Sequence, residues 1–239
     1  MPALLAERVT ARYGPVTVVH EATVSVDDGR LVAIIGPNGA GKSTFVKALA
    51  GVLRPAGGRV VLGGEDLTGL PAHKIARRGL GYVPQNANVF PSLSVVENLE
   101  MGGFTRRSGL HARIAEVLDI FPDLAKATKK RAGELSGGQQ NMLAMARALM
   151  LDPRVMVLDE PTAGLSPAYT QVVWDQVHRL TQAGIATLVV EQNVDRALAN
   201  ASWVYVFVAG TNHVDGPSAE VAALDLAAIF LGKATAYAG

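Results

Sequence analysis

A glycine-rich segment constrains this chain more than any other feature of its sequence. The segment runs from Gly36 to Thr44 and reads Gly-Pro-Asn-Gly-Ala-Gly-Lys-Ser-Thr. It follows the apolar run Leu31–Ile35, which has the character of a buried strand, and leads into a helical segment at Lys42–Ala50. Two glycines five residues apart, followed by lysine and a hydroxyl residue between a strand and a helix, predict a phosphate-binding loop.

Each residue type in this loop has a chemical reason. Glycines let the backbone curl so that successive N–H groups face an anion, and the helix N-terminus adds its positive dipole end. We expect Lys42 to reach the β- and γ-phosphates of a nucleotide, Ser43 to bind Mg²⁺ and Thr44 to donate to the α-phosphate. An ordinary strand-to-helix turn is the alternative, which the Lys-Ser-Thr sequence disfavours. The predicted loop residues are Gly36, Pro37, Asn38, Gly39, Ala40, Gly41, Lys42, Ser43 and Thr44.

A second apolar run ends in two carboxylates. Val155–Leu158 is followed by Asp159 and Glu160. A buried parallel strand delivers its last residues to the carboxyl edge of the sheet, where open α/β sheets bind ligands. We therefore expect Asp159 to bind the metal ion, directly or through a water, and Glu160 to polarise an attacking water. A solvated acidic turn is the alternative.

Short apolar runs alternate with helical segments, which predicts an α/β fold with a mostly parallel core sheet. Thr187–Val190 is a further buried strand, whereas Val16–Val26 alternates with period two and predicts a half-exposed antiparallel strand. With Val9–Tyr13 and Arg59–Leu62 it would form a small antiparallel β subdomain. We expect one domain over residues 1–239, with a nucleotide-binding α/β lobe at about 1–84 and 152–239 and an inserted α-helical lobe at about 85–151. The expected helices are Lys42–Ala50, Ala72–Arg78, Ser94–Met101, His111–Phe121, Ser136–Leu151 and Pro167–Ala183.

Composition excludes several classes of function. The chain has no cysteine, which excludes disulfides, thiolate metal sites and cysteine catalysis. Its formal net charge is +1, and aromatic residues make up 5%, so we expect no nucleic-acid partner. The N-terminus lacks the pattern of a secretory signal, and the apolar runs are shorter than the roughly 18 residues that cross a bilayer.

A third motif, Leu135-Ser-Gly-Gly-Gln139, opens the helical segment before the strand at Val155. Ser136 is a good helix N-cap, so a plain capped helix is the simplest interpretation. Two adjacent glycines are nevertheless costly in a first helical turn. They are explained if a phosphate approaches the backbone closely, which predicts a second nucleotide-facing surface.

Together these motifs resemble the ATP-binding cassette ATPases, in the order found in that family. The resemblance spans nearly the whole chain and is most specific in the signature Leu135–Gln139. It implies a P-loop NTPase fold with ATP and Mg²⁺ as cofactors. It also implies a head-to-tail dimer that sandwiches two ATP molecules. Each ATP would meet the phosphate loop of one subunit and Ser136, Gly137, Gly138 and Gln139 of the other.

The resemblance assigns roles to further residues. Tyr13 matches the aromatic that stacks on adenine, and Gln85 matches the glutamine that contacts Mg²⁺ and senses the transmembrane partner. Asn86–Leu93 should border the groove for a short helix of that partner. Ser166 stands where the family often has aspartate in the loop between subunits, which is a departure from the pattern.

The main departure lies after the strand Thr187–Val190. The family has a histidine there that bridges the γ-phosphate and the catalytic glutamate, whereas this chain has Gln192. A glutamine amide can donate a hydrogen bond to phosphate but cannot become cationic. The expected catalytic residues are therefore Glu160, Gln192 and Lys42, and the expected metal-binding residues are Ser43, Gln85 and Asp159.

Two further segments resemble one subfamily, the ATPase subunits of branched-chain amino acid uptake systems. They are Glu191–Val194 and Phe230–Gly232. This resemblance implies an importer for branched-chain amino acids or similar small polar solutes. Its partners would be transmembrane permeases, a second ATPase subunit and, indirectly, a solute-binding protein. The chain would sit peripherally on the cytoplasmic face of the membrane. The alternatives are an exporter or lipid-transport ATPase, or a cassette protein outside transport.

Overall fold

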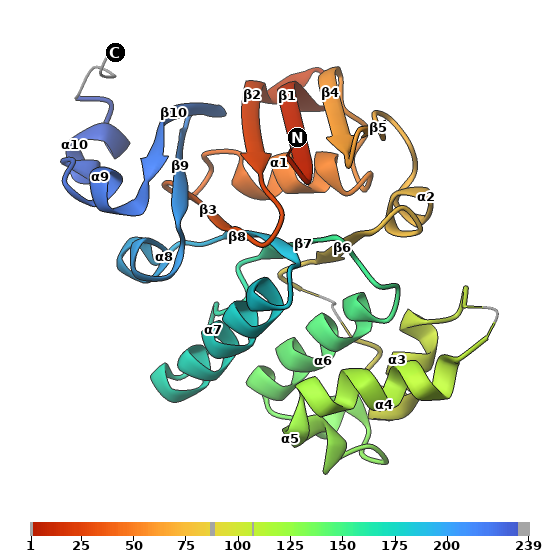
Figure 1. Cartoon of the computed structure of the whole chain (residues 1–239). Coiled ribbons are helices and arrows are strands. Elements are labelled where there is room, and N and C mark those ends of the chain that lie inside the picture. Colours follow the sequence, from red (N-terminus) through yellow and green to blue (C-terminus); the bar gives the residue numbers. More distant parts are fainter. Residues whose placement is uncertain (1, 87–88, 107, 234–239) are drawn as a thin grey trace.

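A six-stranded sheet forms the centre of the computed structural model, which describes residues 2–86, 89–106 and 108–233 (Figure 1). Its strand order is β10-β9-β3-β8-β7-β6. Neighbouring strands are parallel except for the antiparallel pair at β9 and β10. The strands are β3 (Leu31–Ile35), β6 (Leu80–Val83), β7 (Val155–Asp159), β8 (Ala186–Val190), β9 (Trp203–Val208) and β10 (Thr211–Pro217).

The three central strands confirm the prediction from the apolar runs. Every residue of β3, β7 and β8 is buried, as expected for parallel strands that are covered on both faces. The sequence analysis does not identify β6, which has only four residues and contains Gly81. Its extended form depends on pairing with β7, from Leu80 opposite Val155 to Val83 opposite Leu158.

The predicted antiparallel subdomain is confirmed as a second sheet with strand order β2-β1-β4-β5. Its strands are β1 (Leu4–Tyr13), β2 (Val16–Val26), β4 (Gly57–Leu62) and β5 (Glu65–Asp66). The alternating residues Ala22, Val24 and Val26 are buried, because they face the core that this sheet shares with helix α1 (Lys42–Leu49). Phe45 of α1 packs edge-on against Phe207 of β9, with ring centroids 5.2 Å apart.

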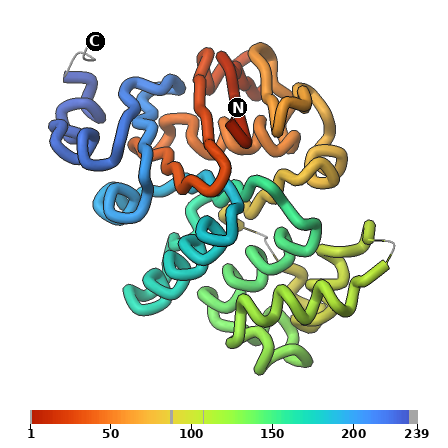
Figure 2. The backbone as a smooth tube through the Cα atoms, in the orientation of Figure 1, coloured from red at the N-terminus to blue at the C-terminus, as the bar shows by residue number. Residues whose placement is uncertain are grey.

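Helices form a second core on the opposite face of the parallel sheet. Figure 2 shows the stretch between β6 and β7 as a unit below that sheet. Within its described residues the elements are helical, and Ser94 and Arg131 add one isolated β-bridge. These elements are α3 (Val95–Gly102), α4 (Leu110–Ile120), α5 (Pro122–Ala125), a 3₁₀ turn (Ala132–Glu134) and α6 (Gly137–Leu149). The remaining helices are α2 (Ala72–Ala76), α7 (Pro167–Gln182), α8 (Val194–Asn200), α9 (Ser218–Ala222) and α10 (Leu226–Phe230).

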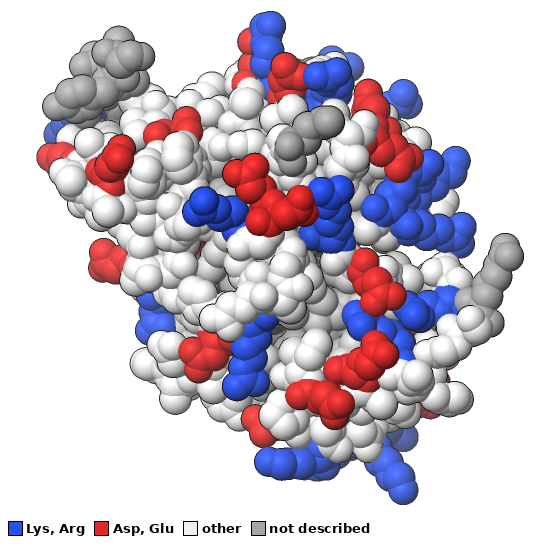
Figure 3. All heavy atoms as spheres, viewed as in Figure 1, with Lys and Arg blue, Asp and Glu red and all other residues white. Residues whose placement is uncertain are grey.

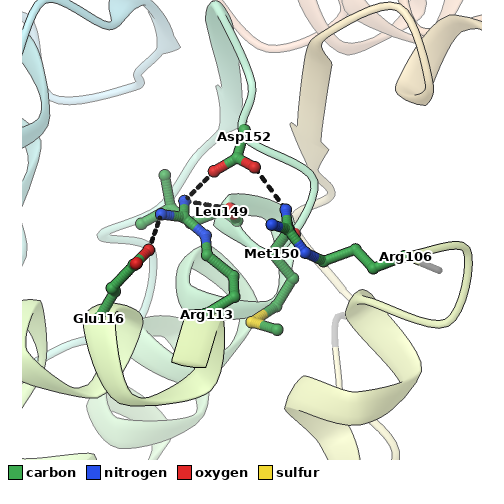
Figure 4. A network of polar contacts seen from close by, with 6 residues as sticks. All are labelled: Arg106, Arg113, Glu116, Leu149, Met150 and Asp152. Atoms are coloured by element: carbon green, nitrogen blue, oxygen red, sulfur yellow. Dashed lines mark hydrogen bonds and ion pairs between the residues drawn. The ribbon is translucent and has the colours of Figure 1, made fainter. Parts of the chain in front are cut away.

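An arginine–aspartate network fixes the turn that joins α6 to β7 (Figure 4). Asp152, in the left-handed region with φ 51°, pairs with Arg106 and with Arg113, the latter at 2.9 Å. Arg113 also donates to the carbonyl of Leu149 at 2.6 Å, where the negative end of the α6 dipole favours a cation. The network therefore holds α4 against the end of α6 and sets the start of β7, which carries Asp159 to the sheet edge.

The surface has both charge signs interspersed on the face in Figure 3. Basic side chains gather on the right of this face, over the region of α2. Within the described residues, the helices are all too short or too polar to span a bilayer.

Candidate functional site

The strand order brings four predicted motifs to one edge of the sheet. In the order β3-β8-β7-β6, the carboxyl ends lead into the phosphate loop, Gln192, the Asp159–Glu160 pair and Gln85. Because these strands are parallel, their carboxyl ends lie on the same side. Because β8 lies between β3 and β7, Gln192 follows a strand that lies between the strand before the phosphate loop and the strand that ends in Asp159.

The phosphate loop is shaped by packing as well as by its own turns. At Gly36 an added Cβ would lie 2.1 Å from the carbonyl oxygen of Phe207, so only glycine fits against β9. Gly39 and Gly41 both have positive φ, and Gly41 precedes the first residue of α1. Lys42 is 5% exposed, and its Nζ donates to the carbonyls of Gly36 at 2.7 Å and Pro37 at 3.0 Å. The loop's own backbone therefore holds the ammonium group in place.

The electrostatics of the loop depend on burial. Burial lowers the pKa of Lys42, against the opposing effect of the Glu160 and Asp159 carboxylates. Burial also raises the pKa of Asp159, and this effect outweighs the hydrogen bond from Ser43. A cationic and an anionic group are thus enclosed close together, where charges interact more strongly than in water.

The donor set at Asp159 fits a magnesium ion. Ser43 Oγ donates to Asp159 Oδ1 at 2.9 Å, which brings a hydroxyl and a carboxylate oxygen together. Tyr82 OH lies 3.5 Å from Asp159 Oδ2. Magnesium takes oxygen ligands and is commonly held by one or two protein groups together with waters and substrate phosphates. Among the described residues, no group of three His, Cys, Asp or Glu side chains is arranged to hold a metal ion.

Glu160 is held by contacts from two other strand ends. Its backbone has φ 51°, and its N–H donates to the carbonyl of Val190 at 2.9 Å. Gln85 Nε2 donates to Glu160 Oε2 at 2.6 Å, and Gln192 Nε2 lies 2.9 Å from both carboxylate oxygens. The structure thus joins Glu160, Gln85 and Gln192 directly. Contact with Glu160 is one of the two contacts that the family resemblance implies for Gln192.

The signature segment forms a capping box at the start of α6. Gln139 N–H donates to Ser136 Oγ at 3.3 Å, and Ser136 N–H donates to Gln139 Oε1 at 3.1 Å. Helix α3 begins with a similar box made by Ser94 and Glu97. The α6 box uses a neutral glutamine where α3 has a carboxylate, so it adds no negative charge at an exposed helix N-terminus. The Ser136 hydroxyl accepts in the box and keeps its own proton to donate.

The two signature glycines have different surroundings. At Gly138 an added Cβ would lie 2.4 Å from the Tyr169 ring, so this glycine lets α6 pack against α7. At Gly137 the nearest atom would be Leu165 Cδ2 at 3.7 Å, and Gly137 is exposed. Close packing of helices therefore accounts for Gly138, whereas a side chain at Gly137 would make only an ordinary contact, so packing does not account for that glycine.

Among the described residues, Tyr13, Ser166 and Phe90 make no hydrogen bond to this cluster. Tyr13, at the end of β1, is 48% exposed. Ser166 caps α7 through the N–H of Tyr169. Of Asn86–Leu93, residues 87 and 88 lie outside the described residues. Phe90 is 41% exposed, and the Arg147 guanidinium lies over its ring at 4.5 Å.

Sequence reasoning missed several polar residues at the same edge. Tyr82 lies beside Asp159, and burial first, then the Asp159 carboxylate, raises the pKa of its hydroxyl. Glu191 is buried, and its carboxylate accepts a hydrogen bond from the Thr162 hydroxyl. The carbonyl of the preceding residue, Pro161, accepts a hydrogen bond from Asn141. Buried position cannot be read from these residue types alone. The position of Glu191, directly before Gln192, was the feature of the sequence that could have pointed to it.

Comparison with known proteins identifies the family. The sequence pattern described as "ABC transporter" matches residues 19–163, which is more than half of the chain. A solved ATP-binding cassette of an ABC transporter in its ADP conformation superposes with a TM-score of 0.85 at 27% identity. The alignment covers 97% of this chain and 95% of that one.

Individual relatives are transport ATP-binding proteins. The high-affinity branched-chain amino acid transport protein BraG of Pseudomonas aeruginosa is 40% identical over 205 residues, 85% of this chain and 88% of BraG. The probable branched-chain amino acid transport protein LivF of Archaeoglobus fulgidus is 38% identical over 90% of this chain and 92% of LivF. The lipopolysaccharide export protein LptB of Escherichia coli is 32% identical over 92% of this chain and 93% of LptB. The chain therefore belongs to the ABC transporter family, as an ATP-binding subunit that couples ATP hydrolysis to transport.

Proposed function

We propose that this chain is the ATPase subunit of an importer for branched-chain amino acids or similar small polar solutes. The observation that carries the proposal is the similarity to BraG and LivF over 85% or more of the chain. Glutamine at position 192, where the wider family has histidine, supports the same assignment.

In the proposed reaction, the phosphate loop binds the nucleotide. Lys42 neutralises the β- and γ-phosphates, Thr44 donates to the α-phosphate, and the loop from Gly36 to Gly41 supplies backbone N–H groups. Ser43, Asp159 and Gln85 would hold Mg²⁺, which offsets the phosphate charge. Glu160 orients and polarises the attacking water.

The proposed assembly is a dimer of cassettes beneath two permeases. Tyr13 would stack on adenine, and Ser136, Gly137, Gly138 and Gln139 would contact the ATP held by the other subunit. The exposed Phe90, backed by Arg147, suits a permease helix. The chain would act as one domain, with an α/β lobe at about 1–84 and 152–239 and a helical lobe at about 85–151. It would lie on the cytoplasmic face of the membrane, and a solute-binding protein would deliver the solute.

The importer assignment is tested by deleting the gene and measuring uptake of radiolabelled leucine, isoleucine and valine by whole cells. We expect uptake to fall and to return when the wild-type gene is restored. The similarity to LptB favours export as the second candidate. Unchanged uptake together with accumulation of a cell-envelope lipid would replace the first assignment with the second.

Gln192→Ala should lower ATP turnover with little change in ATP affinity. One donor between Glu160 and the γ-phosphate is lost while Lys42 and the partner's signature remain, so the barrier should rise by about 1–3 kcal/mol. Turnover is measured in the assembled transporter, because an isolated subunit need not form the closed site. Gln192→His is the control and should keep or raise activity. Wild-type turnover of Gln192→Ala would remove Gln192 from the proposed mechanism.

Ser136→Arg should block turnover while the isolated chain keeps its ATP affinity. A bulky cation would stand where a small hydroxyl must approach the phosphate held by the other subunit. Ser94→Ala, in the matching box of α3, controls for the loss of roughly 1 kcal/mol of helix capping. If Ser136→Arg weakened ATP binding by the isolated chain as much as it lowered turnover, Ser136 would belong to its own subunit's site.

A further inference from the structure

A buried carboxylate beside Gln192 has no part in the mechanism above. Glu191 is 3% exposed, and it lies directly after β8, with its N–H donating to the carbonyl of Ile34 at 3.1 Å. A carboxylate removed from water in this way is costly unless hydrogen-bond donors surround it.

The donors to Glu191 come from two different segments. Thr162 Oγ donates to Glu191 Oε1 at 2.7 Å, and Thr162 is itself 9% exposed. Burial raises the pKa of this carboxylate, and the Thr162 hydroxyl and the backbone N–H groups of Gln192 and Asn193 oppose that effect. The side chain therefore joins the turn after β7 to the turn after β8, at the residue directly before Gln192 in the chain.

The same turn after β7 is tied to the signature helix. Asn141 of α6 donates from Nδ2 to the carbonyl of Pro161 at 2.9 Å. Pro161 and Thr162 directly follow Glu160 in the chain. A continuous path of hydrogen bonds and short chain segments thus runs from α6 through Thr162 and Glu191 to Gln192, and from there to Glu160.

We propose that the Thr162–Glu191 pair is a positioning pair, which transmits the placement of the signature helix to Gln192 and so to the carboxylate of Glu160. The proposal rests on the proposed roles of Gln192 and Glu160. It goes beyond them, because it gives the residues that set the position of Gln192. A shift of α6 displaces Pro161, and Thr162 carries that displacement to Glu191, which directly precedes Gln192 in the chain. The test measures the coupling between Thr162 and Gln192 directly.

The test compares Thr162→Val with Thr162→Ser in the assembled transporter. Valine keeps the shape of threonine but lacks the donor, whereas serine keeps the donor. We expect Thr162→Val to lower kcat for ATP hydrolysis about tenfold, which is about 1.4 kcal/mol, with the KM for ATP changed by less than about twofold. Thr162→Ser should stay within about twofold of wild type.

A double-mutant cycle separates positioning from general damage. If Thr162 acts through Gln192, Thr162→Val combined with Gln192→Ala should be no slower than Gln192→Ala alone, within about twofold. If Thr162 had a merely structural role, the fold losses in kcat of the two single variants would multiply in the double variant. Melting temperatures are measured for all variants. Should Thr162→Val fail to fold, Glu191→Met serves in its place, because it removes the oxygen to which Thr162 Oγ donates.

The outcomes distinguish this inference from the proposed function. Wild-type kcat in Thr162→Val, or multiplied losses in the double variant, would overturn the positioning pair while leaving Gln192 in place. Wild-type turnover in Gln192→Ala would remove the proposed role of Gln192, and the positioning pair with it. The inference is supported if Thr162→Val has a low kcat, Thr162→Ser has a kcat close to that of wild type, and Thr162→Val causes no further loss in the Gln192→Ala background.

Discussion

Lys42→Ala should nearly abolish ATP hydrolysis and also weaken ATP binding. The buried ammonium is held inside the loop by the carbonyls of Gly36 and Pro37, and its charge would neutralise the β- and γ-phosphates in both the ground state and the transition state. Removing one such electrostatic contact costs on the order of 10²–10³-fold in turnover. Turnover in the assembled transporter and ATP affinity of the isolated chain are the two measurements.

Two further variants make the Lys42 result specific. Lys42→Met keeps much of the side-chain length without the charge and should be as inactive as the alanine variant. Lys74→Ala removes a positive charge from the exposed side of α2 and should retain wild-type turnover. If Lys42→Ala hydrolysed ATP at the wild-type rate, the assignment of the phosphate loop would be wrong.

Glu160→Gln should keep ATP affinity but lower hydrolysis by roughly 10²–10⁴-fold, the usual contribution of a general base. The amide has nearly the shape of the carboxylate, so Gln85 and Gln192 keep an oxygen to which they can donate. Because ATP would bind without being hydrolysed, the variant should accumulate as an ATP-bound dimer. Size-exclusion chromatography with ATP and Mg²⁺, with and without a partner ATPase subunit, measures that dimer.

The neighbouring carboxylate provides the matched control for Glu160. Asp159→Asn leaves Glu160 in place but removes the charge beside the Ser43 hydroxyl, so it should weaken the Mg²⁺ dependence of ATP binding. Glu160→Gln should leave that dependence unchanged. A Glu160 variant that stayed monomeric and turned over normally would exclude Glu160 as the base.

Local sequence patterns were sufficient to predict the main elements. The apolar runs at β3, β7 and β8 predict buried parallel strands, and the alternation in Val16–Val26 predicts the half-exposed strand β2. Those patterns are local consequences of burial on two faces or on one. Strand β6 was not predicted, because four residues that include Gly81 become a strand only through pairing with β7.

The chemical motifs could also be predicted from the sequence, but the sequence does not show why some of their glycines are required. The sequence predicts that glycine lets phosphate approach the backbone, yet the carbonyl of Phe207 excludes any side chain at Gly36, and the Tyr169 ring excludes one at Gly138. Both neighbours are distant in the chain, so no local sequence pattern predicts these contacts.

The sequence by itself determined the chemistry of the protein: a lysine and hydroxyl after a glycine-rich turn, two carboxylates after a strand, and a serine at a helix start. Only the tertiary structure decided how these groups meet. The order β3-β8-β7-β6 places Gln192 between the phosphate loop and Glu160, and it brings Thr162 onto the buried Glu191. Residue type fixes which atoms can donate, accept or carry charge. Strand order, which depends on long-range packing, fixes which of those atoms come within hydrogen-bonding distance.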